Sequence, residues 1–356
     1  MPRPSIIFHF ALLALALTGC KTSSRKPARL TKLPDLRPPV APAEVAPRPI
    51  IRTPIPPPRV TPTPASNEWL SWRSWSQSQG YGVPQRLASA TNIYQLKTAD
   101  NTLAIIPGSR LAYWNGMEQW LGFAPILADG QPYVHTLDLQ KNFQPLLQPM
   151  PTSPRTSRIV VIDPGHGGEN TGARSVLGSS QEKEFTLDWA LRLRPLLTAQ
   201  GWTVWLTRTN DCDVSLANRV AFAELHQADL FLSLHFNSAS PNPGQAGLET
   251  YCLTPMGMAS SLTRGFEDDP ALALPNNAFD AQNLQYAAQL HRALVRATAR
   301  TDRGVRRARF MGVLRSQNRP AVLLEAGYLS NPQEARLIAS PEYRRKLAEA
   351  VASALE

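Results

Sequence analysis

The chain has 356 residues, with 33 prolines and a formal net charge of +10. This length suits one full-sized domain plus a smaller one. The apolar residues are unevenly spread, so a single core that includes the whole chain is excluded. A basic balance of this size also raises the question of a nucleic-acid partner.

The first 20 residues have the pattern of an export signal. Met1 to Gly19 carries Arg3 at its start and an apolar run from Ile6 to Leu17, which is too short for a comfortable membrane span. The run ends in Leu17-Thr18-Gly19-Cys20, which resembles the lipobox of bacterial lipoproteins. That resemblance implies that Cys20 becomes the lipidated first residue of the mature chain, and an ordinary signal peptide is the alternative.

Export sets the expected location and partners. Lys21 follows Cys20 where an aspartate would stand in a retained lipoprotein, which by resemblance favours the periplasmic face of the outer membrane. Export argues against nucleic acid. The positive charge near the anchor instead suits anionic lipid headgroups or the carboxylate-bearing polymers of a cell wall, and a merely well-solvated tail is the alternative. The charged residues concerned are Lys21, Arg25, Lys26, Arg29 and Lys32.

Residues 21–66 read as a proline-rich linker. The stretch from Pro27 to Pro64 holds 13 of the 33 prolines and has no apolar periodicity. Such a segment forms no core and is expected to be extended, at about 3.1 Å per residue in the polyproline II form. It would hold a folded domain on the order of 100 Å from a membrane.

Residues 67–150 are expected to form a small α+β, β-rich accessory domain. Asn115-Gly116 and Asp129-Gly130 are tight-turn signals between alternating apolar runs. The motifs resemble the small domain at the front of copper amine oxidases, without implying copper ligands; they are Tyr113-Trp114-Asn115-Gly116, Ala124-Pro125-Ile126 and Tyr133-Val134. Three tryptophans, Trp69, Trp72 and Trp75, have near-helical spacing and are expected in the core, with stacking on sugar rings as the alternative.

Residues 156–356 alternate strand and helix patterns and predict an α/β fold, a mainly parallel twisted sheet with helices on both faces. The expected strands are 158–163, 203–207, 229–235, 247–252 and 320–325. The expected helices are 182–200, 215–227, 284–300 and 341–355, the first of them kinked at Pro195.

Four side chains fall at one edge of this predicted sheet. His166, His235 and Glu325 follow apolar strands, and Glu182 begins a helix. Because open α/β sheets bind ligands at the carboxyl ends of their strands, we expect these groups to converge. Two imidazoles and one carboxylate are the ligand set of an open Zn²⁺ site, and a second carboxylate nearby is the base that metal-assisted hydrolysis needs.

Each of these assignments has a simpler alternative. A single histidine can be a hydrogen-bonded core residue, and Glu325 can form a salt bridge or close a structural metal site as a fourth ligand. Asp163 is the candidate carboxylate that accepts from the other ring nitrogen of His166 and thereby fixes its tautomer. The glycines beside His166 are expected to let the backbone turn sharply and a ligand approach closely.

Five motifs in order resemble the zinc-dependent N-acetylmuramoyl-L-alanine amidases over nearly the whole segment from Arg158 to Leu355. They are Val161-Ile162-Asp163-Pro164-Gly165-His166-Gly167-Gly168, Glu182-Lys183-Glu184, Thr207-Arg208 with Leu216 and Arg219, Ser233-Leu234-His235-Phe236-Asn237-Ser238, and Pro320 to Asn331. The resemblance implies His166, Glu182 and His235 as zinc ligands and Glu325 as the catalytic carboxylate. It implies peptidoglycan as the substrate, cleaved between N-acetylmuramic acid and the L-alanine of the stem peptide.

Other functions remain open from the residues alone. A non-catalytic lipoprotein that binds peptidoglycan would use the same fold without turnover, and a metallopeptidase would cut elsewhere in the stem peptide. The segment 254–283 is either an inhibitory lid that a partner protein removes or a substrate-binding loop. Cys212 and Cys252 either pair in a disulfide or are two buried free thiols.

Overall fold

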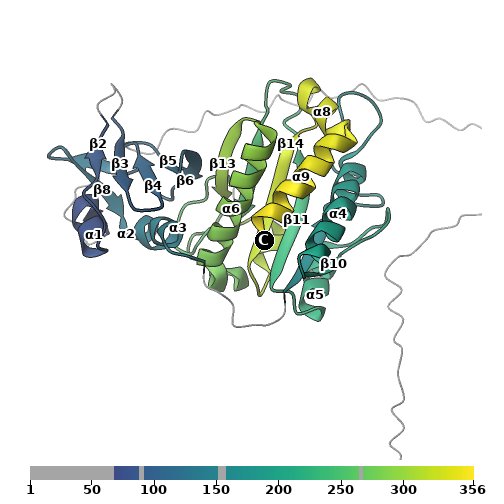
Figure 1. Ribbon diagram of the computed structural model, residues 1–356, viewed down its shortest axis with the longest axis horizontal. Coiled ribbons are helices and arrows are strands. Elements are labelled where there is room, and N and C mark those ends of the chain that lie inside the picture. The colour runs from purple at the N-terminus through teal and green to yellow at the C-terminus, as the bar shows by residue number, and fades with distance from the viewer. Residues whose placement is uncertain (1–67, 88–91, 151–157, 264–267) are drawn as a thin grey trace, which may run out of the picture. The chain divides into compact units, whose positions relative to one another are not determined.

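The computed structural model describes residues 68–87, 92–150, 158–263 and 268–356 (Figure 1). The proposed signal peptide, the lipidation site Cys20 and the linker 21–66 lie outside these residues, so they stay predictions. Within the described ranges no helix is both long and apolar enough to cross a lipid bilayer.

The small domain combines short strands with short helices. Its strands are β1 (Trp69–Ser71), β2 (Gln85–Arg86), β3 (Tyr94–Lys97), β4 (Thr102–Ile105), β5 (Leu111–Trp114), β6 (Met117–Trp120), β7 (Ile126–Ala128) and β8 (Gln131–His135). Its helices are α1 (Trp72–Ser78), α2 (Thr136–Asp138), the π-helix η1 (Leu139–Phe143) and α3 (Gln144–Leu147). Strands β2 to β6 form an antiparallel series, and β1, β8 and β7 form a separate sheet.

The core and the turns of this domain follow the sequence pattern. Trp72 and Trp75 are buried and pack against Phe143, with ring centroids 5.8 and 6.1 Å away. The core assignment is therefore confirmed for these two tryptophans. The turns at Asn115-Gly116 and Asp129-Gly130 join β5 to β6 and β7 to β8, and all four residues have the positive φ that such tight turns require.

The second domain is built on a six-stranded part of the large sheet, in the order β10-β9-β11-β14-β12-β13. The strands are β9 (Ile159–Pro164), β10 (Thr203–Leu206), β11 (Leu230–Asn237), β12 (Leu248–Cys252), β13 (Asp302–Arg307) and β14 (Ala321–Tyr328). The helices are α4 (Glu182–Ala199), α5 (Leu216–Leu225), η3 (Pro275–Phe279), α6 (Asp280–Thr298), α7 (Gly312–Arg315), α8 (Pro332–Ala339) and α9 (Pro341–Ala354). Neighbouring strands are parallel except β12 and β14, which confirms the α/β class.

Alternate residues of the central strands face opposite helix layers. Leu232 and Leu324 belong to the larger core under α4, α6 and α9, which lie across one face of the sheet in Figure 1. Phe231 and Leu323 point the other way, into a smaller core with α5 and α7. Because side chains alternate along a strand, the odd-numbered residues of β9, β11 and β14 share this second face, and the chemistry described below lies there.

Sequence patterns did not reveal every element. Strand β13 and the helices α7 and α8 were not expected, and α4 continues through Pro195 to Ala199. Glu325 does not close its strand, because β14 runs three residues further, to Tyr328.

The described residues of the small and the second domain belong to one compact unit, so the division into two domains stays a prediction. Strand β6 lies parallel to β13, with Gln119 opposite Val305. The backbone N–H of Glu118 donates to Asp302 at 3.0 Å, and Arg307 donates to the backbone carbonyl of Lys141 at 3.0 Å. The pairing of β6 with β13 extends the sheet to eleven strands among the described residues.

Candidate active site

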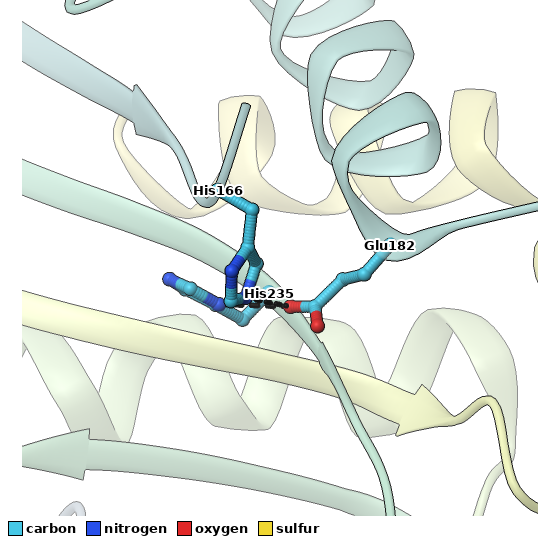
Figure 2. Close-up of side chains that lie close together, drawn as sticks. All are labelled: His166, Glu182 and His235. Carbon is cyan, nitrogen blue, oxygen red and sulfur yellow. Dashed lines mark hydrogen bonds and ion pairs between the residues drawn. The ribbon is translucent and has the colours of Figure 1, made fainter. Parts of the chain in front are cut away.

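Three predicted metal ligands meet at one point above the sheet (Figure 2). Oε1 of Glu182 lies 3.1 Å from Nε2 of His166 and 2.8 Å from Nδ1 of His235. One ligand atom from each residue lies within 4.8 Å of the others. The side chains come from the loop after β9, the start of α4 and the end of β11, so the convergence expected at this edge is confirmed.

Glycines make this convergence possible. A Cβ at Gly165 would lie 2.2 Å from Cε1 of His235, and a Cβ at Gly172 would lie 2.6 Å from both Oε2 of Glu182 and Cδ2 of His166. His166 itself has a φ of 63°, a left-handed conformation that is uncommon outside glycine. The backbone after β9 is therefore shaped to bring two ligands close together.

The ligand side chains are oriented by further hydrogen bonds. Asn170 Oδ1 lies 2.8 Å from Nδ1 of His166. Oε2 of Glu182 accepts from the backbone N–H of Ala173 at 2.9 Å, and its Oε1 accepts from that of Phe236 at 3.0 Å. Such contacts fix the ring and carboxylate orientations that a metal requires. The sequence analysis missed Asn170, although it stands four residues after His166 on the same glycine-rich loop.

Asp163 has a different role from the one expected. Its buried carboxylate is ion-paired with Arg219 and accepts from Thr207 Oγ1 at 2.6 Å and Ser233 Oγ at 2.8 Å. The prediction that it accepts from the other ring nitrogen of His166 is wrong, because that nitrogen, Nδ1, contacts Asn170 and the carboxylate of Asp163 binds three other donors. It acts on the loop indirectly: Arg219 also donates to the backbone carbonyl of His166 at 2.7 Å.

Glu325 lies directly beside the ligands. It pairs in register with His235 on the neighbouring parallel strand, so the two side chains leave the same face of the sheet. Its Oε2 is buried and has no hydrogen-bond partner among the described residues. Burial, together with the negative charges of Glu182 and Glu249, raises the pKa of Glu325 well above its usual range.

The pKa of Glu182, the carboxylate among the three predicted ligands, is shifted in the opposite direction to that of Glu325. Burial alone would raise the pKa of Glu182, but its hydrogen bonds to His166 and His235 hold that pKa well below its ordinary value. For the His166 imidazole, burial by itself would lower the pKa. The hydrogen bond to Glu182 outweighs burial, so the pKa of His166 is raised. The cluster therefore stabilises an ionised carboxylate between two imidazoles.

The donor set fits a zinc ion with an open coordination position. Two imidazole nitrogens and one carboxylate oxygen are a common catalytic zinc triad, and no thiol belongs to the set. A pocket of about 410 Å³ adjoins it. The residues lining this pocket include His166, Asn170, Leu216, Arg219, His235 and Val313.

The segment 254–283 packs away from this pocket over its described part. Arg309 donates to the backbone carbonyls of Pro255 and Met258, and Arg110 of the small domain donates to that of Ala259 at 2.8 Å. None of its described residues lines the pocket beside His166. Cys212 and Cys252 are not joined in a disulfide; Cys252 is buried, and Cys212 is half-buried.

The second part of the chain is similar to known proteins. The family model for N-acetylmuramoyl-L-alanine amidases matches residues 160–356. The amidase AmiA of Salmonella typhimurium is 31% identical over 221 residues, which cover 56% of this chain and 75% of the relative. AmiA of Escherichia coli is 32% identical over 216 residues, covering 55% and 74%. The solved catalytic domain of CwlV from Bacillus (Paenibacillus) polymyxa var. colistinus is 31% identical, with a TM-score of 0.46, covering 56% of this chain and 96% of that domain.

The matched segment holds all four residues that converge on the site, and it makes up more than half of the chain. The chain therefore belongs to the N-acetylmuramoyl-L-alanine amidase family and is a peptidoglycan amidase.

Proposed function

We propose that His166, Glu182 and His235 bind zinc and that Glu325 is the general base and acid for cleavage of the amide between N-acetylmuramic acid and L-alanine. The observation that carries this proposal is the position of two different carboxylates. Glu182 contacts both imidazoles, whereas Glu325, one strand away from His235, has a free buried oxygen. One carboxylate is thus committed to binding and the other is left for proton transfer.

The chemistry of the protein side chains follows from these positions. Bound zinc supplies Lewis-acid polarisation and lowers the pKa of a water from about 15.7 toward 7. Glu325 accepts a proton from the attacking water and delivers it to the departing alanine nitrogen, since an amide anion is a poor leaving group. A raised pKa suits this carboxylate to hold the proton between the two steps.

The location of the protein follows from its substrate. Peptidoglycan lies outside the cytoplasmic membrane, so the enzyme acts as an exported protein. We further propose that Cys20 carries a lipid anchor at the periplasmic face of the outer membrane and that the linker 21–66 lets the catalytic domain reach the wall. Palmitate labelling of wild type and of the variant C20S tests the anchor, with label expected only in wild type.

The substitution E325Q tests the catalytic role. The variant keeps the shape of the side chain but cannot accept a proton, so we expect normal zinc content and a kcat about 10²- to 10⁴-fold lower. The matched control is E349Q, which removes an exposed carboxylate on α9 that pairs only with Arg345. Near-normal turnover by E325Q would overturn the role assigned to Glu325.

Mass spectrometry of the fragments released from purified peptidoglycan separates the competing functions. Free stem peptides that begin with L-alanine, together with intact glycan strands, are expected. Cleavage inside the stem peptide would indicate a metallopeptidase, and binding without release by the zinc-loaded protein would indicate a non-catalytic wall-binding lipoprotein.

A further inference from the structure

A second buried glutamate lies beside the proposed base. Glu249 on β12 pairs antiparallel and directly opposite Glu325 on β14. Directly opposed residues leave the same face of a sheet, about 4.5 to 5.5 Å apart at Cβ, so two carboxylates face each other here. Glu249 is only 3% exposed, and like charges at this position are unfavourable unless another interaction compensates.

The compensation comes from four donors that bind Glu249. Its Oε1 accepts from Arg303 Nε at 2.8 Å and lies 3.1 Å from Arg306 Nε. Its Oε2 accepts from the Tyr251 hydroxyl at 2.8 Å and from Asn237 Nδ2 at 3.1 Å. Glu249 is therefore fully satisfied, whereas the neighbouring Oε2 of Glu325 has no partner among the described residues.

Each of the two guanidinium groups also contacts an aromatic ring. Arg306 lies over the ring of Trp120, 4.8 Å from its centroid, and Arg303 lies 5.6 Å from the centroid of Tyr328. Trp120 belongs to β6 of the small domain, so this domain contributes directly to the arrangement. Cation–π contacts of this kind favour one orientation of each guanidinium.

An arginine that reached Glu325 would impair it as a base. Charge-assisted pairs between guanidinium and carboxylate are strong hydrogen bonds, and a carboxylate engaged in one accepts a proton from water less readily. If Glu249 loses its charge, the unpartnered Oε2 of Glu325, on the residue directly opposite in β14, offers the arginines another acceptor.

We propose that Glu249 is a positioning residue that binds Arg303 and Arg306 and thereby keeps Glu325 free for catalysis. This inference rests on the proposed function of Glu325. It assigns to Glu249 no contact with the substrate. It also explains why a second carboxylate is buried next to a base that it repels.

The substitution E249Q is the first test. With a soluble muramoyl peptide as the substrate, we expect kcat to fall about 10²-fold, the low end of what a general base contributes, with KM and zinc content unchanged. The matched control is E118Q, because Glu118 carries a negative charge near the same arginines without a hydrogen bond to either. We expect E118Q to retain the wild-type kcat.

A rescue variant separates positioning from simple loss of stability. Replacing both arginines in the triple variant E249Q/R303M/R306M removes the competing cations, so most of the lost kcat is expected to return. Rates are measured per zinc-loaded protein at a temperature well below the melting transition of each variant, which circular dichroism provides. A kcat of E249Q equal to wild type, or a fall that the triple variant does not recover, would refute the positioning role.

Wild type and E325Q in the same assay distinguish the failure of this inference from the failure of the proposed function. If E325Q turns over like wild type, the role of Glu325 fails and the inference fails with it. If E325Q is inactive while E249Q is fully active, only the inference about Glu249 fails.

Discussion

Glu182 and Glu325 are carboxylates on the same side of one sheet, yet their surroundings oppose each other. Glu182 contacts two imidazoles and two backbone N–H groups, which lower its pKa. Glu325 is half-buried, and the desolvation of its carboxyl together with the charges of Glu182 and Glu249 raises its pKa. The residue type therefore does not determine the role; the number of donors around each carboxylate does. Substitutions at the metal-binding side chains and at the residues around them test this difference between Glu182 and Glu325.

The largest effect on zinc content and activity is expected from H235A, which removes one of the proposed zinc ligands. Removing one imidazole leaves two ligands, too few for the open zinc site, so zinc content and amidase activity should both fall to background. Metal analysis of the purified protein measures the zinc content, and the release of stem peptides measures the amidase activity. The control is H226A, whose ring stacks on Trp205 away from the site. A zinc-loaded, active H235A protein would contradict the ligand assignment.

A smaller loss of zinc binding is expected from G165A, which retains all three metal-binding side chains. The added Cβ would lie 2.2 Å from the His235 ring, so the imidazole must leave its present position. We expect zinc affinity to fall about 10- to 100-fold, as for other changes in ligand orientation. The control G82A places a methyl group where the nearest heavy atom is 3.8 Å away. Competition with a chelator gives both affinities, and equal values would show that Gly165 is not needed for this approach.

The variant N170A removes the acceptor beside Nδ1 of His166, and N170D retains one. Because this contact fixes the orientation of the imidazole, N170A should weaken zinc binding by about 10-fold, the low end of such effects, and N170D should restore most of it. Isothermal titration with zinc measures the difference. If N170A binds as tightly as wild type, the ring is oriented by other contacts.

The smallest effect concerns a third buried carboxyl, remote from the metal ligands. Burial raises the pKa of Asp138 to about 6 from 3.8, despite bonds from Gly122, Phe123 and Asn142. At pH values between 3.8 and about 6 this carboxyl binds more protons in the folded than in the unfolded state. Its contribution to the unfolding free energy therefore falls as the pH rises, by about 1.4 kcal/mol per pH unit.

The variant D138N removes this titration. The unfolding free energy of wild type relative to D138N should therefore fall by roughly 1.4 kcal/mol from pH 5 to pH 8. Chemical denaturation at several pH values measures it. A constant difference would show that Asp138 titrates alike in both states.

The sequence predicted those parts of the fold whose signals are local. Apolar runs located β9, β11 and β14, and helical periodicity located α4 and α9 within a few residues. Strand β13 was missed because Asp302 to Arg307 contains four charged residues and a single large apolar one, Val305. It is a strand because β12 and β6 provide its hydrogen bonds, which a local pattern does not register.

The residues of the site could likewise be predicted where the signal is local, but their long-range partners could not. Strand ends and the five motifs predicted that His166, Glu182, His235 and Glu325 converge, and they do, because their positions follow from sheet topology. The partners of those residues were not identified. Asp163 was assigned to the wrong partner, since its contact with Arg219 joins residues 56 positions apart. Glu249 was missed because its role depends on the antiparallel register of β12 with β14.

Anomalous diffraction at the zinc edge, from crystals grown with zinc, tests the central claim most directly. We predict a single strong peak about 2.0 to 2.2 Å from the nearest nitrogens of His166 and His235 and an oxygen of Glu182, with Glu325 near but outside the coordination sphere. A structure without zinc at these three side chains, or with Glu325 as a fourth ligand that closes the site, would contradict it.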